Sequence, residues 1–414
     1  MKTVAKLVSG AVLVAGLTAC GFSSEKSGSS KDDNSISLAV WGSSPAETKG
    51  LEKTVATFEK ESGIDVKIEV IQDNFQDALT ARFAAKNAPD VFYLESFTAP
   101  KFIKSGVVAE LKDVDNPDDF YQPLLNSFKD EGKLYALPKD YSTLGMYVNT
   151  DLLTKAGYTM EDVPKDWVGL MAFSKELQGK LAKDQAAMIF DTAFARNMSS
   201  LIASGLTPVT DKNRADFTSS PEALDYLQSL VDGKKAGYLK NPSIDLGMDS
   251  AGAAFGSNKA VIMIEGNWVL SALRQNYPDV KYEVVEAPTV NGKNQTTTFT
   301  VGYAMAKATD KKEAATEFVK YMTGKGQQQW SEISVTFPTR QSVAEAMKLD
   351  QNEVVKAHVL GAEYGTVWSS GVNLPVISTA FDNQFTAAVN GDKTVEQAMK
   401  DTEKEANDEI KRQQ

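Results

Sequence analysis

The chain has 414 residues, and its 44 basic and 55 acidic side chains give a net charge of −11 at pH 7. An acidic chain of this kind is a poor partner for nucleic acid, which we therefore exclude. It contains one histidine and one cysteine. An intrachain disulfide is thus impossible, and neither a Ser-His-Asp triad nor a histidine-based metal site is expected. The histidine, His358, is interpreted as a surface or packing residue.

The first residues of the chain have the features of an export signal. A short basic stretch precedes an apolar segment, residues 7–17, which is too short to span a bilayer permanently. The sequence Leu-Thr-Ala-Cys at residues 17–20 resembles the bacterial lipobox. That resemblance implies a signal peptide over residues 1–19 and a diacylglycerol on Cys20. The alternative is a conventional signal peptide followed by an unmodified thiol.

Residues 20–35 are predicted to form a flexible tether, because they contain almost no apolar side chain that could pack. Without residues 1–19 the chain keeps 42 basic and 55 acidic residues, a net charge of −13. The lipid, rather than a basic patch, would then hold the protein at the membrane. We expect the protein on the extracellular face of the cell membrane of a Gram-positive organism.

The part of the chain that follows the tether, about 380 residues, is longer than one hydrophobic core usually covers, so two lobes are expected. Its first elements alternate between apolar strand patterns and helical spacing, which is typical of an α/β lobe with a largely parallel sheet. Strands are predicted at residues 37–41, 64–70 and 90–94, and helices at residues 47–61 and 77–86.

The same alternation returns later in the chain. Ser220 as N-cap and Pro221 at the first helical position predict a helix that stops near Gly233. The continuous apolar run at residues 260–264 predicts a strand. Two further helices are predicted, one at residues 311–322 ended by Gly324 and one from Thr394 to the C-terminus with a capping box to Gln397.

Several segments, in this order and spacing, resemble the bacterial extracellular solute-binding proteins, the family that includes the maltose-binding protein. The resemblance covers nearly everything after the tether. Its most specific stretch joins Gly-Lys-Leu-Tyr-Ala-Leu-Pro to Leu-Gly-Met-Tyr-Val-Asn-Thr-Asp; Val148 stands where the family usually has a second tyrosine. The segments are residues 37–42, 58–66, 88–91, 132–138, 144–153, 265–268 and 311–322.

The resemblance implies a type II periplasmic-binding-protein-like fold, with two α/β lobes around a ligand cleft. Three segments would cross between the lobes, at residues 141–145, 298–302 and 340–344. One lobe would hold residues 36–142 and 302–340, and the other would hold residues 143–301 and 341–414. Closure of such a cleft around a ligand is a hinge motion that a membrane permease can sense.

The function implied by the resemblance is the capture of a carbohydrate for an ABC importer, by a monomer without enzymatic activity or cofactor. Maltodextrins and raffinose-type oligosaccharides are the ligands we would expect first. The chain has no Walker glycine pattern, so its partners would be two permease subunits and a separate ATPase. Two kinds of alternative stay open: a non-sugar ligand (a polyamine, a phosphodiester or an iron chelate), and a glycoside hydrolase or structural lipoprotein.

Sugars offer flat apolar ring faces and a rim of hydroxyls, so a sugar cleft needs aromatic rings beside carboxylates, amides and arginines. Such groups gather beyond the carboxyl ends of strands in open α/β sheets. The expected ligand residues are Trp41, Ser43, Glu95, Ser96, Phe97, Asp140, Tyr141, Arg196, Asn197, Gly266, Trp268, Tyr303 and Trp368, with Phe75 and Gln76 as weaker candidates.

Each of these residues also has a structural interpretation. The aromatic residues could belong to a lobe core, Glu95 and Asp140 could be solvated or capping carboxylates, and Arg196 could pair with a neighbouring acid. The acidic segment at residues 113–119 superficially suggests a calcium loop. It lacks the required glycine and bidentate glutamate, so we interpret it as a solvated loop.

Overall fold

The first strands and helices of the body form an α/β unit, as the sequence predicts. The computed structural model describes residues 34–72 and 74–413, so the expected signal peptide, the lipidated Cys20 and nearly all of the tether lie outside the described residues. Strands β1 (Ser35–Trp41), β2 (Asp65–Ile71) and β3 (Val91–Glu95) are parallel, with β1 in the middle. Helices α1 (Pro45–Ser62) and α2 (Phe75–Ala84) connect them. All five elements confirm the sequence prediction to within a few residues.

The remaining elements continue the α/β pattern. The other strands are β4 (Lys129–Asp130), β5 (Lys133–Leu134), β6 (Ala136–Asn149), β7 (Ala186–Ile189), β8 (Leu239–Lys240), β9 (Ala260–Gly266), β10 (Tyr282–Glu286), β11 (Thr297–Met305) and β12 (Thr366–Val367). The other helices are α3 (Ala99–Lys104), α4 (Gln122–Asn126), α5 (Thr150–Lys155), α6 (Trp167–Gln178), α7 (Phe194–Ala203), α8 (Pro221–Ala236), α9 (Pro242–Leu246), α10 (Ala251–Gly256), α11 (Val269–Asn276), α12 (Lys312–Met322), α13 (Gln327–Ser334), α14 (Gln341–Ala346), α15 (Lys356–Tyr364), α16 (Leu374–Val389) and α17 (Val395–Gln413), with short 3-10 turns at Pro117–Asp119, Met160–Asp162 and Leu349–Gln351.

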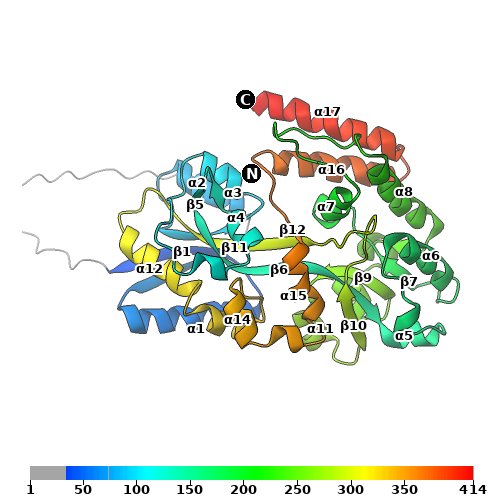
Figure 1. Ribbon diagram of the computed structural model, residues 1–414, viewed down its shortest axis with the longest axis horizontal. Coiled ribbons are helices and arrows are strands. Elements are labelled where there is room, and N and C mark those ends of the chain that lie inside the picture. The colour runs from blue at the N-terminus through cyan, green and yellow to red at the C-terminus, as the bar shows by residue number, and fades with distance from the viewer. Residues whose placement is uncertain (1–33, 73, 414) are drawn as a thin grey trace, which may run out of the picture. The chain divides into compact units, whose positions relative to one another are not determined.

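The long strand β6 links two groups of strands. The hydrogen-bonded order is β2-β1-β3-β11-β6-β9-β7-β8, with β10 also on β6 and β12 on β11. The first half of β6 pairs with β11 through residues 136–143, and its second half pairs with β9 and β10 through residues 144–149. Figure 1 shows β6 running from one group of strands to the other. Strand β11 lies between β3 and the first half of β6 and pairs with both.

Each group of strands has its own hydrophobic core. One core is built around Phe58, Phe92 and Phe318, from the first part of the chain and from α12. A second core is built around Phe194 and Phe381, from the later part. A third cluster lies between the later strands and the crossing region. Separate cores agree with two lobes, while the lobe boundaries given above stay a prediction.

Two predicted helix ends differ in detail from the structure. Helix α8 begins at Pro221 with Ser220 as its cap, as predicted, but it continues to Ala236 and ends at Gly237, whose φ is 82°. Gly233 is buried inside the helix because Leu239 packs where a Cβ would stand. In α17, Thr394 accepts a hydrogen bond from the backbone of Gln397. The side chain of Gln397 donates to Asp401 instead of completing the capping box.

His358 lies in the interior, so the surface interpretation is wrong and the packing interpretation holds. The side chain is fully buried between α15 and β6. Its Nδ1 lies 2.9 Å from the carbonyl oxygen of Thr143, which can only accept, so Nδ1 carries the proton. Its Nε2 then accepts from the hydroxyl of Tyr147 at 2.7 Å. A Cβ at Gly145 would come within 2.8 Å of the imidazole ring, so glycine is required there.

Burial lowers the pKa of His358 to about 4, against an ordinary value of 6.5. The unfolded chain therefore binds a proton more readily, and the stability that neutral His358 contributes is lost as the pH falls from 6.5 towards 4. We expect wild type to lose about 2 to 3 kcal/mol more than His358→Phe between pH 7.5 and 4.5. Urea unfolding at a series of pH values measures this. Parallel pH curves for the two proteins would contradict it.

Candidate functional site

Three of the expected ligand residues gather at one edge of the first group of strands. Trp41 is the last residue of β1, and Glu95 is the last residue of β3. Since β11 is antiparallel to both β3 and β6, β6 runs parallel to β3. Val301 of β11 is paired with Glu95 on one side and with Asp140 on the other. The two carboxylates therefore lie on one face of the sheet, at the carboxyl edge where α/β proteins bind ligands.

Aromatic and amide side chains surround this carboxyl edge. The Trp41 ring makes edge contacts with Tyr93 and Phe75, at centroid distances of 4.9 and 5.3 Å. The amide of Gln76 donates to Glu95 at 3.1 Å. Burial raises the pKa of Glu95, and this hydrogen bond opposes the rise. Ser43 is half-buried on the loop between β1 and α1.

A second group of expected ligand residues surrounds the end of β9. Trp268 is 42% exposed, the guanidinium of Arg196 lies 4.8 Å from its ring centre, and Phe299 contacts it edge-on. Arg196 is fixed by an ion pair of 3.0 Å to Glu265. A Cβ at Gly266 would come within 2.0 Å of the Trp268 ring, so only glycine lets the ring lie over this turn.

Glu265 was missed by the sequence analysis as a site residue. One carboxylate oxygen accepts from Arg196, and the other accepts from the backbone of Gly266 at 2.8 Å. Burial raises the pKa of Glu265, and Arg196 opposes the rise. Its position directly after an apolar strand and directly before the Gly-Asn-Trp turn was the signal that could have identified it.

The residues that follow β3 and β12 meet each other. The rings of Phe97 and Trp368 stack with centroids 5.0 Å apart and an angle of 8° between their planes. Ser96 donates to the carbonyl oxygen of Trp368 at 3.0 Å, and the backbone of Trp368 donates to Thr298 of β11 at 2.8 Å. The predicted lobe boundaries assign Phe97 and Trp368 to different lobes. The structure therefore brings Ser96, Phe97 and Trp368 into one contact.

Three other expected ligand residues are buried in this structure. Tyr303 lies between Tyr93 and Phe318 in the first core and is 1% exposed. Tyr141 is also 1% exposed, in the cluster at the crossing region. Asn197 donates to two backbone carbonyls at the start of α7 and accepts from a tyrosine hydroxyl. Their ligand roles stay predictions, and their burial argues for packing roles instead.

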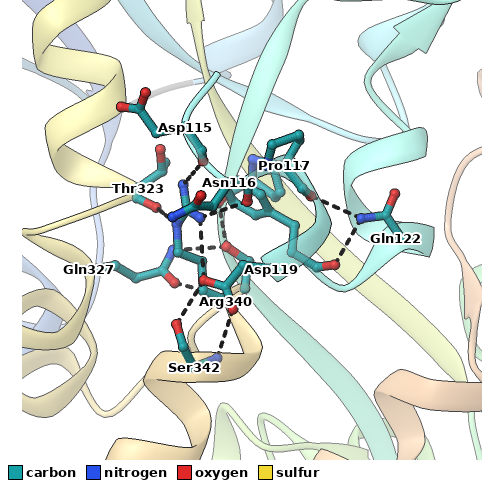
Figure 2. A network of polar contacts seen from close by, with 12 residues as sticks. Asp115, Asn116, Pro117, Asp119, Gln122, Thr323, Gln327, Arg340 and Ser342 are labelled. Atoms are coloured by element: carbon teal, nitrogen blue, oxygen red, sulfur yellow. Dashed lines mark hydrogen bonds and ion pairs between the residues drawn. The ribbon is translucent and has the colours of Figure 1, made fainter. Parts of the chain in front are cut away.

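The third expected crossing is anchored by Arg340, which is 7% exposed. Figure 2 shows the segment Asp115–Asp119 around its guanidinium group. The group donates to the carbonyls of Asp115 (3.0 Å), Asn116 (3.1 Å) and Thr323 (2.6 Å) and pairs with Asp119 (3.4 Å). The acidic segment that superficially resembles a calcium loop is largely exposed, which confirms its interpretation as a solvated loop. Two of its backbone carbonyls and the carboxylate of Asp119 also bind an arginine.

The neighbours of Arg340 fix the same turn. Asp119 accepts from the backbone and the hydroxyl of Ser342, at 2.9 and 2.7 Å. The backbone of Arg340 donates to Gln327 at 3.0 Å, and the ring of Phe120 lies 4.0 Å from the guanidinium carbon. This part of the chain is therefore held to the loop at residues 115–120 and to helix α13 as far as Ser342.

Residues 34–72 and 74–413 offer neither a metal cluster of acidic, histidine or cysteine side chains nor a membrane-spanning helix. No three His, Cys, Asp or Glu side chains in these ranges are arranged to hold a metal ion. No helix within the same ranges has the length and apolar character needed to cross a membrane.

Comparison with known proteins gives a family match and close similarities of fold. The family model described as bacterial extracellular solute-binding protein matches residues 53–358. The galactooligosaccharide-binding protein of Bacillus subtilis (strain 168) is 22% identical and covers 95% of this chain and 94% of its own length. The maltodextrin-binding protein MdxE of the same organism is 25% identical with the same coverage.

Solved structures show the same fold. The ABC substrate-binding protein Lmo0181 from Listeria monocytogenes, in complex with cycloalternan, has a TM-score of 0.80 at 22% identity and covers 91% of this chain and 98% of its own. The sugar-binding protein MalE from Xanthomonas citri has a TM-score of 0.81 at 18% identity, with coverages of 92% and 98%. These similarities confirm the predicted two-lobed α/β fold.

The contacts of Arg340 predict a strong effect of its removal. Arg340→Met leaves the buried carbonyl of Thr323 without its donor and removes the cation that pairs with Asp119, so the free energy of unfolding should fall by about 3 to 5 kcal/mol. Lys104→Met is a matched control, because Lys104 also pairs with an acid, Asp130, but is 51% exposed. That control should cost less than about 1 kcal/mol. Urea unfolding measures both variants. Equal losses of unfolding free energy would show that the buried network adds nothing to stability beyond an exposed ion pair.

Proposed function

The chain belongs to the bacterial extracellular solute-binding proteins, and from that premise we propose that it captures an oligosaccharide for an ABC importer. The similar proteins support this ligand class, since their names specify galactooligosaccharide, maltodextrin and cycloalternan binding. The maltooligosaccharide ABC transporter solute-binding lipoprotein of Streptococcus pneumoniae (strain ATCC BAA-255 / R6), 25% identical over 293 residues, supports the transport role.

The observation that carries the proposal is the exposed ring of Trp268 beside the Arg196–Glu265 ion pair. An exposed tryptophan face next to fixed hydrogen-bonding groups suits a sugar, which has an apolar ring face and polar edges. The carboxyl edge with Glu95 and Asp140 supplies further acceptors for hydroxyl groups. The ligand cleft of the proposal lies between these two surfaces, with the Phe97 and Trp368 stack at one side.

The hinge is proposed to lie where chain segments pass between the lobes. The first lobe would hold residues 36–142 and 302–340, and the second would hold residues 143–301 and 341–414. Strand β6 hydrogen-bonds with β11 through its first half and with β9 through its second half, which supports the first of the crossings. Closure of the lobes around a sugar would convert binding into a shape that permease subunits recognise.

The location and partners are part of the same proposal. Lipidation of Cys20 would keep a monomer on the extracellular face of the membrane, next to two permease subunits and an ATPase, and the lipoprotein named above supports this. The family is one of solute-binding proteins. We therefore expect the ligand to be released chemically unchanged.

Ligand binding should raise the midpoint of thermal unfolding, because the folded state alone offers the site. We expect a rise of about 3 to 6 °C with one oligosaccharide class at roughly 100 times its dissociation constant. The chain from Gly21 onward would be tested with maltodextrins, raffinose-type sugars, monosaccharides, a polyamine and a phosphodiester. A rise with the polyamine or phosphodiester alone would keep the transport role and overturn the sugar assignment.

Trp268→Ala should weaken binding of that sugar by at least about fivefold, because an aromatic face contributes about 1 to 3 kcal/mol to a buried contact. The unfolding midpoint should change little, since the ring is 42% exposed. Val168→Ala, at a side chain that is 78% exposed in α6, serves as the control. Isothermal titration calorimetry measures both variants. Unchanged affinity in Trp268→Ala would remove this ring from the site.

A further inference from the structure

A bulge in β6 changes the direction of one side chain at the carboxyl edge. Val301 of β11 is paired with Asp140, but the next residue, Gly302, is paired with Pro138, so Lys139 is an extra residue in β6. A bulge of this kind bends a strand locally and redirects a side chain. A Cβ at Gly302 would come within 3.0 Å of the Ala136 side chain, so glycine permits the close approach of the two strands at this point.

The redirected side chain of Lys139 enters the first core. The residue is 4% exposed, and its ammonium group lies 4.7 Å from the ring centre of Tyr93 and 4.5 Å from that of Trp330. A buried ammonium is costly unless it is paired. Among the described residues its ion-pair partner is the carboxylate of Asp140. The cost of burying Lys139 is therefore offset through its chain neighbour.

Asp140 lies between this buried amine and the carboxyl edge. Lys139 contacts its Oδ2, and no hydrogen bond within the described part of the chain reaches its Oδ1. The side chain keeps 12% exposure. The backbone carbonyl of Asp140 accepts from Thr300 at 2.7 Å, which fixes the main chain at this position. Oδ2 of Asp140 is thus bound by Lys139, and Oδ1 is available to a hydroxyl donor.

Three other ionisable groups that the structure describes lie around Asp140, and one of them, Glu47, opposes its charged form. Glu47 at the start of α1 adds a negative charge, and the phenols of Tyr93 on β3 and Tyr303 on β11 face the same cluster. Burial raises the pKa of Asp140, and Lys139 is the group that opposes this rise. On β6 itself Tyr141 follows Asp140, and its side chain packs in a different cluster.

We propose that Lys139 is a positioning residue of the ligand site, which holds the Asp140 carboxylate in place and ionised so that it can accept a hydrogen bond from a sugar hydroxyl. This inference rests on the proposed function. A stabilising role alone explains the pair poorly, since replacing a buried ion pair by apolar side chains is often neutral. The bulge places the charge directly beneath the edge where the ligand would lie.

The test is the pH dependence of sugar affinity in wild type and three variants, using the sugar identified by thermal unfolding. Wild type should keep its affinity to a lower pH than Lys139→Met, because Lys139 opposes protonation of Asp140. Lys139→Met should bind within about threefold of wild type at pH 8 and lose roughly tenfold per pH unit once Asp140 becomes protonated. Asp140→Asn should bind weakly at every pH. Adding Glu47→Gln to Lys139→Met should move the loss of affinity to lower pH.

A loss in Lys139→Met that is equal at all pH values, or no loss at all, would overturn the proposal. If Lys139→Met does not fold, Lys139→Gln is judged by the same profile. A carbon-13 NMR titration of Asp140 in the unliganded wild-type chain decides independently of any ligand. The carboxyl should lose its charge at a lower pH there than in Lys139→Met, and titration at the same pH in both proteins would also overturn the proposal.

The two proposals fail in different ways. If no sugar raises the unfolding midpoint, the ligand class is overturned. The NMR titration still decides whether Lys139 keeps Asp140 ionised. If a sugar binds but Lys139→Met shows a flat pH profile, the proposed function stands and the role of Lys139 falls.

Discussion

The structure depends on one constraint: β6 must satisfy its backbone hydrogen bonds on both sides of the crossing region. Its first half pairs with β11 and its second half with β9 and β10. Because buried backbone groups must be paired, a displacement of this strand would break backbone hydrogen bonds in both groups of strands. Residues of β6 also shape its surroundings. Lys139 and Asp140 lie at its bulge, next to the candidate site, and Gly145 leaves room for the buried ring of His358.

Ion pairs that are buried or half-buried recur at the points where segments meet. Arg340 binds backbone carbonyls and pairs with Asp119, Lys139 pairs with Asp140, and Arg196 pairs with Glu265. Pairs of this kind gain little net stability, because desolvation offsets most of their attraction. They do fix geometry, since a misplaced partner would leave a buried charge alone. Rigid lobes with defined edges are what a hinged binding protein requires.

The sequence predicted most of the framework because local patterns determine it. Strand and helix periodicity located the elements of the first lobe, and Ser220 with Pro221 marked the start of α8. The end of that helix was misjudged because the burial of Gly233 depends on Leu239, a contact that periodicity does not encode. The burial of His358 was missed for a similar reason. Its partners Thr143 and Tyr147 lie on β6, which is distant from it in the sequence.

The candidate site was less predictable because it depends on register and on partners. Tyr303 and Asp140 were both expected to contact the ligand, yet strand pairing puts Tyr303 in the core and Asp140 at the edge. The acidic segment 113–119 makes the same point. Composition shows that it can surround a cation, but only the fold shows that the cation is the guanidinium of Arg340, a residue more than 200 positions away. A cation carried by the chain itself ties the segment to the third crossing permanently, which a dissociable metal ion would not do.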